Sequence, residues 1–185
     1  MKIDFTYFIE GLKKASTNMN DKSYFQIDNT ESEELIYRER VYCYELYHQL
    51  RCVLGDLLSY KLQGEMDKSK HPIIEENYKP DFIFHIPGTM EENLVVMEVK
   101  PVHTQKNKIK DDIEKLINFR NYNYFYGILL MYGNGEQSLP KKIIDLFKSS
   151  LSREYDDYLL FIWHPGPGKE IVILNEDLLS VGEEE

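Results

Sequence analysis

Charged side chains stand at the ends of two apolar runs near the middle of the chain. The first run, DFIFHI at 81–86, opens on Asp81, and the second, NLVVMEV at 93–99, leads into Glu98 and Lys100. Two carboxylates placed together repel each other. They become stable neighbours when they hold a hard divalent cation such as Mg²⁺, which prefers oxygen ligands and keeps several of its waters.

A metal ion held at this point would support hydrolysis. It lowers the pKa of a bound water, which then becomes a nucleophile. Lys100 carries an ammonium that can orient this water or neutralise the charge that develops on a phosphate oxygen. Asp81, Glu98 and Lys100 are therefore the minimal equipment for metal-assisted hydrolysis of a phosphodiester bond. The alternative interpretation is a structural charge cluster at the edge of a sheet.

The two runs can position these side chains only if they pair as strands. The connection PGTMEE contains Pro and Gly and predicts a turn. Side chains alternate across a strand, so Glu98 and Lys100 share one face with Val96, and Val99 points to the other. An antiparallel hairpin then brings Asp81 opposite the end of the second strand, close to both charged residues.

The rest of the chain alternates helices and strands. Helical spacing, or a long stretch without Gly and Pro, predicts helices over 1–14, 33–54, 108–120 and 140–151. Further strands are predicted over 58–66, 124–132, 158–164 and 170–175. This order predicts a single α/β domain, residues 1–185, with helices on a mixed central sheet.

These features resemble a known family. Pro80-Asp81, a spacer and Glu98-Val99-Lys100 look like the motif of the PD-(D/E)XK nuclease superfamily, most similar to a bacterial branch of it. The resemblance implies a restriction-endonuclease-like core, αβββαβ, at about 33–132 and a C-terminal β extension at 133–185. It implies a nuclease that hydrolyses nucleic acid, with DNA as the expected substrate and Mg²⁺, or Mn²⁺ in its place, as cofactor.

The resemblance also implies a set of site residues. Asp81, Glu98 and the backbone carbonyl of Val99 would hold the metal, and Asp81, Glu98 and Lys100 would be the catalytic residues. The family often supplies one more acid from its first helix, and in this chain the preferred candidate is Glu39.

The apolar stripe along the helix predicted over 33–54 is the reason for preferring Glu39. With the helix phase set from Leu35, Glu39 falls inside the apolar sector and Glu45 falls outside it. A carboxylate on a core-facing stripe is costly unless it is paired or bound to metal. Glu45 stays an alternative as the additional acid, as does Glu65 at the end of the strand before Asp81. Glu39 could also have another role, as the partner of an inward Lys or Arg.

Several residues near the motif could contact a substrate. Gln105, Lys106 and Lys108 follow Lys100, and His85 lies within the first strand. Solvated lysines and a satisfied sheet histidine are the simpler interpretations. The tyrosine-rich stretches YFQ, YCYELY and NYNYFYG could stack on nucleobases, although packing is the commoner use of tyrosine.

Charge supports a second function class. The net charge of −10 argues against a general DNA-binding surface, because binding to phosphates needs local Lys and Arg. It favours the alternative of a nuclease-fold module that binds or scaffolds without catalysis. The neighbouring Asp111 and Asp112 are interpreted as partners of a helix N-terminus rather than as site residues.

Cysteine use and hydropathy indicate the compartment. Cys43 and Cys52 are nine residues apart in a predicted helix, and roughly 100° per residue puts them on opposite faces. A reduced, cytoplasmic protein is therefore expected. The chain has no apolar run of membrane-spanning length, so no membrane partner is expected. A homodimer is left open.

Overall fold

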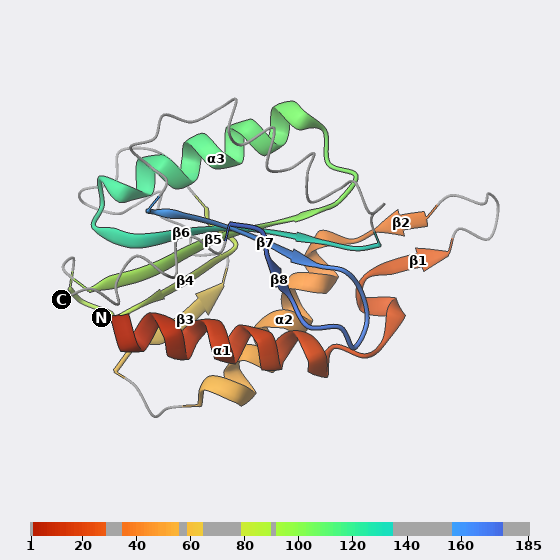
Figure 1. The fold of residues 1–185 in the computed structure, drawn as a ribbon, viewed down its shortest axis with the longest axis horizontal. Helices are drawn as coiled ribbons and strands as arrows, with labels where there is room; N and C mark the ends of the chain where they lie inside the picture. Colours follow the sequence, from red (N-terminus) through yellow and green to blue (C-terminus); the bar gives the residue numbers. More distant parts are fainter. Residues whose placement is uncertain are drawn as a thin grey trace.

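A six-stranded mixed sheet forms the centre of the computed structural model (Figure 1). The structure describes residues 2–28, 35–55, 59–64, 79–89, 92–134 and 157–175. The strand order is β3-β4-β5-β6-β7-β8. The bounds are Lys61–Gly64 for β3, Phe82–His85 for β4, Asn93–Pro101 for β5, Tyr124–Tyr132 for β6, Leu159–His164 for β7 and Val172–Ile173 for β8.

Helices cover both faces of this sheet. In the described part of the chain they are α1 at Lys2–Asn18, α2 at Glu39–Leu54 and α3 at Lys106–Arg120, with a short 3₁₀ turn at Lys22–Tyr24. Figure 1 shows α3 above the sheet and α1 and α2 below it. The predicted α/β class with a mixed sheet between helices is thus confirmed.

The hairpin expected from the two apolar runs is present. Strands β4 and β5 pair antiparallel, with Phe82 opposite Met97, so that Asp81 comes level with Glu98 one residue further on. The turn between the strands uses Gly88 at φ +88°, a backbone conformation that glycine adopts without steric cost. Strand β6 then pairs parallel to β5 after the α3 crossover.

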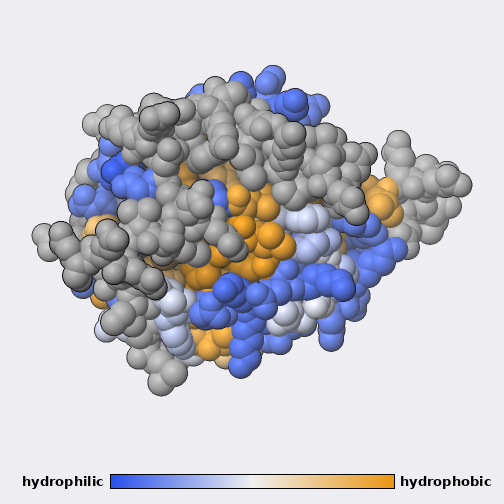
Figure 2. Space-filling view, in the orientation of Figure 1, coloured by the Kyte–Doolittle hydropathy of each residue, from blue (hydrophilic) through white to orange (hydrophobic). Residues whose placement is uncertain are grey.

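Strand β5 divides its side chains between two cores. Val96 packs with the buried residues beneath α3, whereas Met97 and Val99 pack with those of α1 and α2. This is the alternation expected of a strand that is covered on both faces. In the face shown in Figure 2, hydrophobic residues gather at the centre and hydrophilic residues lie along the lower margin, where α1 runs.

The beginning of α2 corrects one prediction. A helix was expected from residue 33, but α2 begins at Glu39, and Leu35–Tyr37 form the strand β2. This strand pairs antiparallel with β1, Gln26–Asp28, in a separate two-stranded sheet. A strand partner nearby competes successfully with helix extension, because Ile and Tyr also suit an extended backbone.

Smaller differences concern the ends of elements. The first helix continues to Asn18, past the expected 1–14, and only Lys61–Gly64 and Val172–Ile173 of the strands expected at 58–66 and 170–175 are assigned to strands. The helix expected at 140–151 lies outside the described residues. Cys43 is buried and Cys52 is exposed, and neither forms a disulfide, in agreement with their expected opposite faces. Within the described ranges, every helix is too short or too polar to cross a membrane.

Candidate active site

Acidic and basic side chains from four places in the chain meet where β5 ends. We call them the carboxylate cluster: Glu39 at the start of α2, Asp81 before β4, Glu98 and Lys100 in β5, and Asp112 and Lys115 in α3. Helix α3 reaches the cluster because it is the crossover that follows β5, and Glu39 reaches it as the first residue of the helix on the other face.

The ammonium group of Lys100 lies among three of the four carboxylates. Its Nζ lies 3.0 Å from Glu39 Oε1, 3.8 Å from Asp81 Oδ2 and 3.9 Å from Asp112 Oδ2. Burial by itself lowers the pKa of the Lys100 ammonium, but Asp81, Asp112 and Glu39 outweigh it and hold the pKa above its ordinary value. Lys100 is therefore a permanent positive charge in this site rather than a base.

Asp81 is fixed against the neighbouring strand. Its Oδ2 accepts a hydrogen bond of 2.7 Å from the backbone N–H of Val99. A side chain held by a backbone donor of a sheet has little freedom to turn away. The antiparallel register thus determines where this carboxylate points, which is toward the segment that carries Glu98 and Lys100.

Glu98 is almost fully buried, with 1% of its surface exposed. Lys115 Nζ lies 2.6 Å from Glu98 Oε1, so the two groups form a close ion pair. Burial, and next the carboxylate of Asp81, raise the pKa of Glu98 to about 8, and Lys115 opposes this rise only in part. Lys115 also donates a hydrogen bond of 2.8 Å to the carbonyl of Lys79.

Asp112 belongs to the cluster, which corrects its interpretation as a partner of the helix N-terminus. Its Oδ2 is buried without a hydrogen-bond partner, and burial raises its pKa against the pull of Lys100 and Lys115. A signal in the sequence could have found it. Asp112 lies three residues after the buried Ile109 and one before the buried Ile113, so it stands in the core-facing stripe of α3.

The cluster fits a divalent cation by charge and by donor chemistry. Its four carboxylates exceed its two ammonium groups by two negative charges when all are ionised. Glu98 Oε1 has the Lys115 ammonium at 2.6 Å, whereas the buried Asp112 Oδ2 has no hydrogen-bond partner, although buried acceptors nearly always have one. Oxygen acceptors with surplus negative charge are what Mg²⁺ and Mn²⁺ prefer.

The ammonium groups of Lys100 and Lys115 lie between these carboxylates. Among the residues that the structure describes, no three His, Cys, Asp or Glu side chains are grouped closely enough to hold a metal ion as they stand. Ligation would therefore require the carboxylates to exchange an ammonium partner for the metal.

The other candidate residues are distributed as follows. Gln105 is the N-cap of α3, and Lys106 and Lys108 are exposed in the next turn, on the segment that leads from Lys100. His85 is at the far end of β4 from Asp81, where its Nε2 lies 2.7 Å from Gln63 Oε1. The structure therefore does not bring His85 to the cluster.

Of the alternative acids, Glu45 is described and is not part of the cluster. Glu45 is half-buried on α2 and accepts a hydrogen bond of 2.7 Å from Gln49. Glu65 lies outside the described residues. Of the two acids that the structure describes, Glu39 is the one that lies against Lys100.

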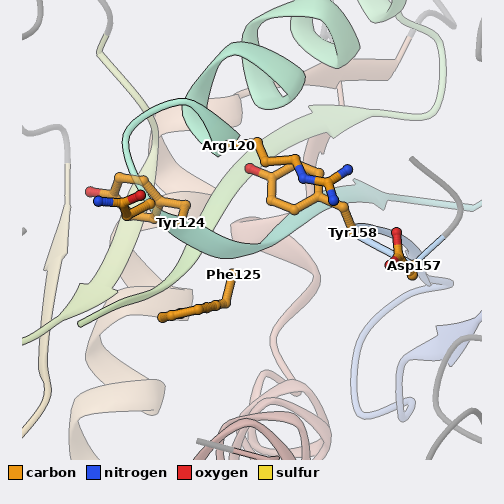
Figure 3. A pocket seen from close by; sticks show the side chains of 6 residues that line it. Arg120, Tyr124, Phe125, Asp157 and Tyr158 are labelled. Carbon is orange, nitrogen blue, oxygen red and sulfur yellow. The ribbon is translucent and has the colours of Figure 1, made fainter. Parts of the chain in front are cut away.

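A cavity of about 550 Å³ lies at the opposite end of β6 (Figure 3). Its lining residues are Arg120, Asn123, Tyr124, Phe125, Asp157 and Tyr158. Tyr124 is the first residue of β6, whereas the residue of β6 beside Lys100 is Met131. Because Asp157 is the sole carboxylate among those lining residues, we place the candidate site at the carboxylate cluster.

Comparison with protein-family models, with curated proteins and with solved structures finds no match to this chain. Inferences about its function therefore depend on the geometry of the cluster and on the sequence motif.

Proposed function

We propose that this protein is a metal-dependent nuclease that hydrolyses phosphodiester bonds of nucleic acid, with DNA as the expected substrate. The observation that carries the proposal is the meeting of Asp81, Glu98 and Lys100 where the interior strand β5 ends, with Glu39 contributed by α2. The order α2-β3-β4-β5-α3-β6 supports it, because a helix, three strands, a helix and a strand is the order that the family resemblance implies.

Asp81 and Glu98 would hold Mg²⁺ or Mn²⁺, with the carbonyl of Val99 and the carboxylate of Glu39 as further ligands. When bound, the metal would supply a water of lowered pKa and a positive charge beside the phosphate. The backbone of Val99 fixes the Asp81 carboxylate for this purpose, and burial keeps bulk water away from Glu98.

Lys100 would act on the reacting groups directly. Its neighbours keep its ammonium charged, so it donates hydrogen bonds to the attacking water and stabilises negative charge on the phosphoryl oxygens. Asp112 and Glu39 limit where this ammonium can lie. Such positioning matters, because a misplacement of about 1 Å can cost roughly 100-fold in rate.

The test uses single-stranded, double-stranded and branched DNA, and RNA, each incubated with the purified chain in Mg²⁺ and in Mn²⁺. Cleavage is expected, and Lys100→Ala should abolish it. Lys110→Ala is the matched control, because Lys110 is an exposed lysine of α3 outside the cluster. Cleavage that survives in Lys100→Ala would refute the assignment of the active site.

A specific observation favours a second function, the non-catalytic module. The ion pairs of Lys100 with Glu39 and of Lys115 with Glu98 already balance part of the charge without a metal. A protein that only binds or scaffolds would keep these pairs in the presence of divalent ions. Calorimetric titration with Mn²⁺ separates the two functions, because heat of binding that disappears in Asp81→Asn is expected of the nuclease alone.

A further inference from the structure

Two cavities lie side by side next to the carboxylate cluster. The smaller, about 270 Å³, is lined by Glu39, Arg40, Cys43, Lys79 and Asp81. The larger, about 420 Å³, is lined by Cys43, Tyr44, Tyr47, Gly64, Asp81 and Phe82. Because Asp81 and Cys43 line both, a molecule whose reacting group lies at the cluster can extend past Asp81 into the larger cavity.

The larger cavity has aromatic walls. Tyr44 and Tyr47 are three residues apart on α2 and so lie on the same side of the helix. Tyr44 is 60% exposed, which leaves most of its ring surface available for contact. The ring of Tyr47 lies nearly parallel to that of Phe82, at an interplanar angle of 10° and a centroid distance of 6.3 Å.

Gly64 lies beside these rings and beside the carbonyl of Asp81. A Cβ at this position would lie 3.6 Å from the Tyr47 ring and 3.8 Å from the Phe82 ring. These are ordinary contact distances, so a small side chain would fit and a large one would fill the cavity. The absence of a side chain at the end of β3 thus helps to keep the space beside the tyrosines open.

Charge indicates what kind of molecule this cavity suits. The smaller cavity adds the cations Arg40 and Lys79 beside Glu39 and Asp81, which provides local contacts for a phosphate. The chain as a whole carries −10, so long-range attraction to a nucleic-acid backbone is weak. Stacking of bases on aromatic rings supplies affinity that does not depend on net charge.

We propose that the larger cavity binds the unpaired base of a nucleotide next to the scissile phosphate, with the base stacked against Tyr44 and Tyr47. This inference rests on the proposed nuclease function and names its substrate class, single-stranded nucleic acid. A base within a duplex is already stacked and paired and cannot present its face to these rings. Arg40 and Lys79 contact the phosphate that joins this nucleotide to the cluster.

The test measures binding of a short single-stranded oligonucleotide that carries 2-aminopurine, whose fluorescence falls when the base stacks. DNA and RNA versions are both titrated with the full chain in EDTA, so that no cleavage takes place. Tyr44→Ala should weaken binding by about 5- to 150-fold, the loss expected for one base–aromatic stack. Tyr44→Phe, which keeps the ring, should bind as the wild type does.

Two further variants control for indirect effects. Gly64→Leu should weaken binding by filling the cavity, and Gly64→Ala should not. Phe125→Ala should leave affinity unchanged, because Phe125 is a partly exposed aromatic in the cavity at the other end of β6. Equal affinity of Tyr44→Ala and wild type, or competition by a blunt duplex as strong as by the single strand, would overturn the inference.

The two proposals fail separately. Quenching that depends on Tyr44, combined with no cleavage in Mg²⁺ or Mn²⁺, would support the base-binding cavity and refute the nuclease. Cleavage that depends on Lys100 but is unaffected in rate and affinity by Tyr44→Ala on a single strand would support the nuclease and refute the cavity.

Discussion

Replacing Lys100 with Ala should affect folding and metal binding in opposite directions. The change removes the shared partner of Glu39, Asp81 and Asp112 and leaves three carboxylates facing one another. Breaking a fully buried pair costs about 3–5 kcal/mol, and an exposed pair is worth about 0.2–1 kcal/mol. The Lys100 side chain is 15% exposed and the Glu39 side chain 38%, so the expected loss of unfolding free energy is intermediate, about 2 kcal/mol.

The same change should strengthen metal binding if the carboxylates are ligands. Lys100 competes with a cation for their oxygens, so its removal should raise Mn²⁺ affinity by about 3- to 10-fold, equivalent to roughly 0.7–1.4 kcal/mol. Added Mn²⁺ should then restore more stability to Lys100→Ala than it adds to the wild type, since ligand binding to the folded state is linked to folding.

The assays are urea unfolding with and without Mn²⁺ and calorimetric titration of both proteins, with Lys110→Ala as the control that changes neither quantity. Weaker Mn²⁺ binding by Lys100→Ala would contradict competition between Lys100 and the metal, because it would mean that the lysine supports the ion. Unchanged stability without metal would show that the three ion pairs contribute nothing to the fold.

Three further outcomes are expected. Asp81→Asn should lower Mn²⁺ affinity by at least about 10-fold, measured by calorimetry, because the amide carries no charge; unchanged affinity would contradict the ligand assignment. Lys106→Ala and Lys108→Ala should weaken substrate binding and reduce its salt dependence without affecting the rate at saturation, and a salt slope equal to that of the wild type would place both lysines away from the substrate. Burial lowers the pKa of His164 from 6.5 to about 4 while Tyr42 Oη lies 2.7 Å from its Nδ1. The neutral form is favoured in the folded state, so this contribution is present above about pH 6.5 and is lost, by about 3 kcal/mol in total, as the pH falls toward 4. Unfolding free energies of the wild type and His164→Gln, compared over that range, should converge at low pH, and a constant difference would contradict the assigned pKa.

Local patterns predicted the hairpin that carries the motif. The two-residue period of the strands and the short Pro/Gly connection together specify that the strand after Asp81 pairs with the strand of Glu98 and Lys100. The period and the turn can be read from the sequence because each depends only on neighbouring residues. The helical stripe likewise selected Glu39 over Glu45, and it did so even though Leu35, from which the phase was set, lies in a strand. The residues that follow Glu39 carry the stripe by themselves: Tyr42, Leu46 and Leu50 are all buried.

Packing between segments distant in the sequence sets how charge is distributed in the site. Asp112 and Lys115 enter the cluster because α3 packs against β5. The sequence does not reveal this contact, because an aspartate near the start of a predicted helix is explained equally well by the helix N-terminus. The start of α2 at Glu39 depends on the pairing of β2 with β1, a contact between segments that periodicity within either segment does not reveal.

The residues that could do chemistry follow from the amino-acid sequence, since side-chain types and their strand and helix periods are local properties. Packing between distant segments sets which partners each charge has: Lys100 lies among three carboxylates, and Glu98 is buried against Lys115. It also placed Gly64 beside Tyr47 and Phe82. Ion pairing, burial and cavities depend on distances between segments far apart in the chain, and these distances are set by packing of the whole core.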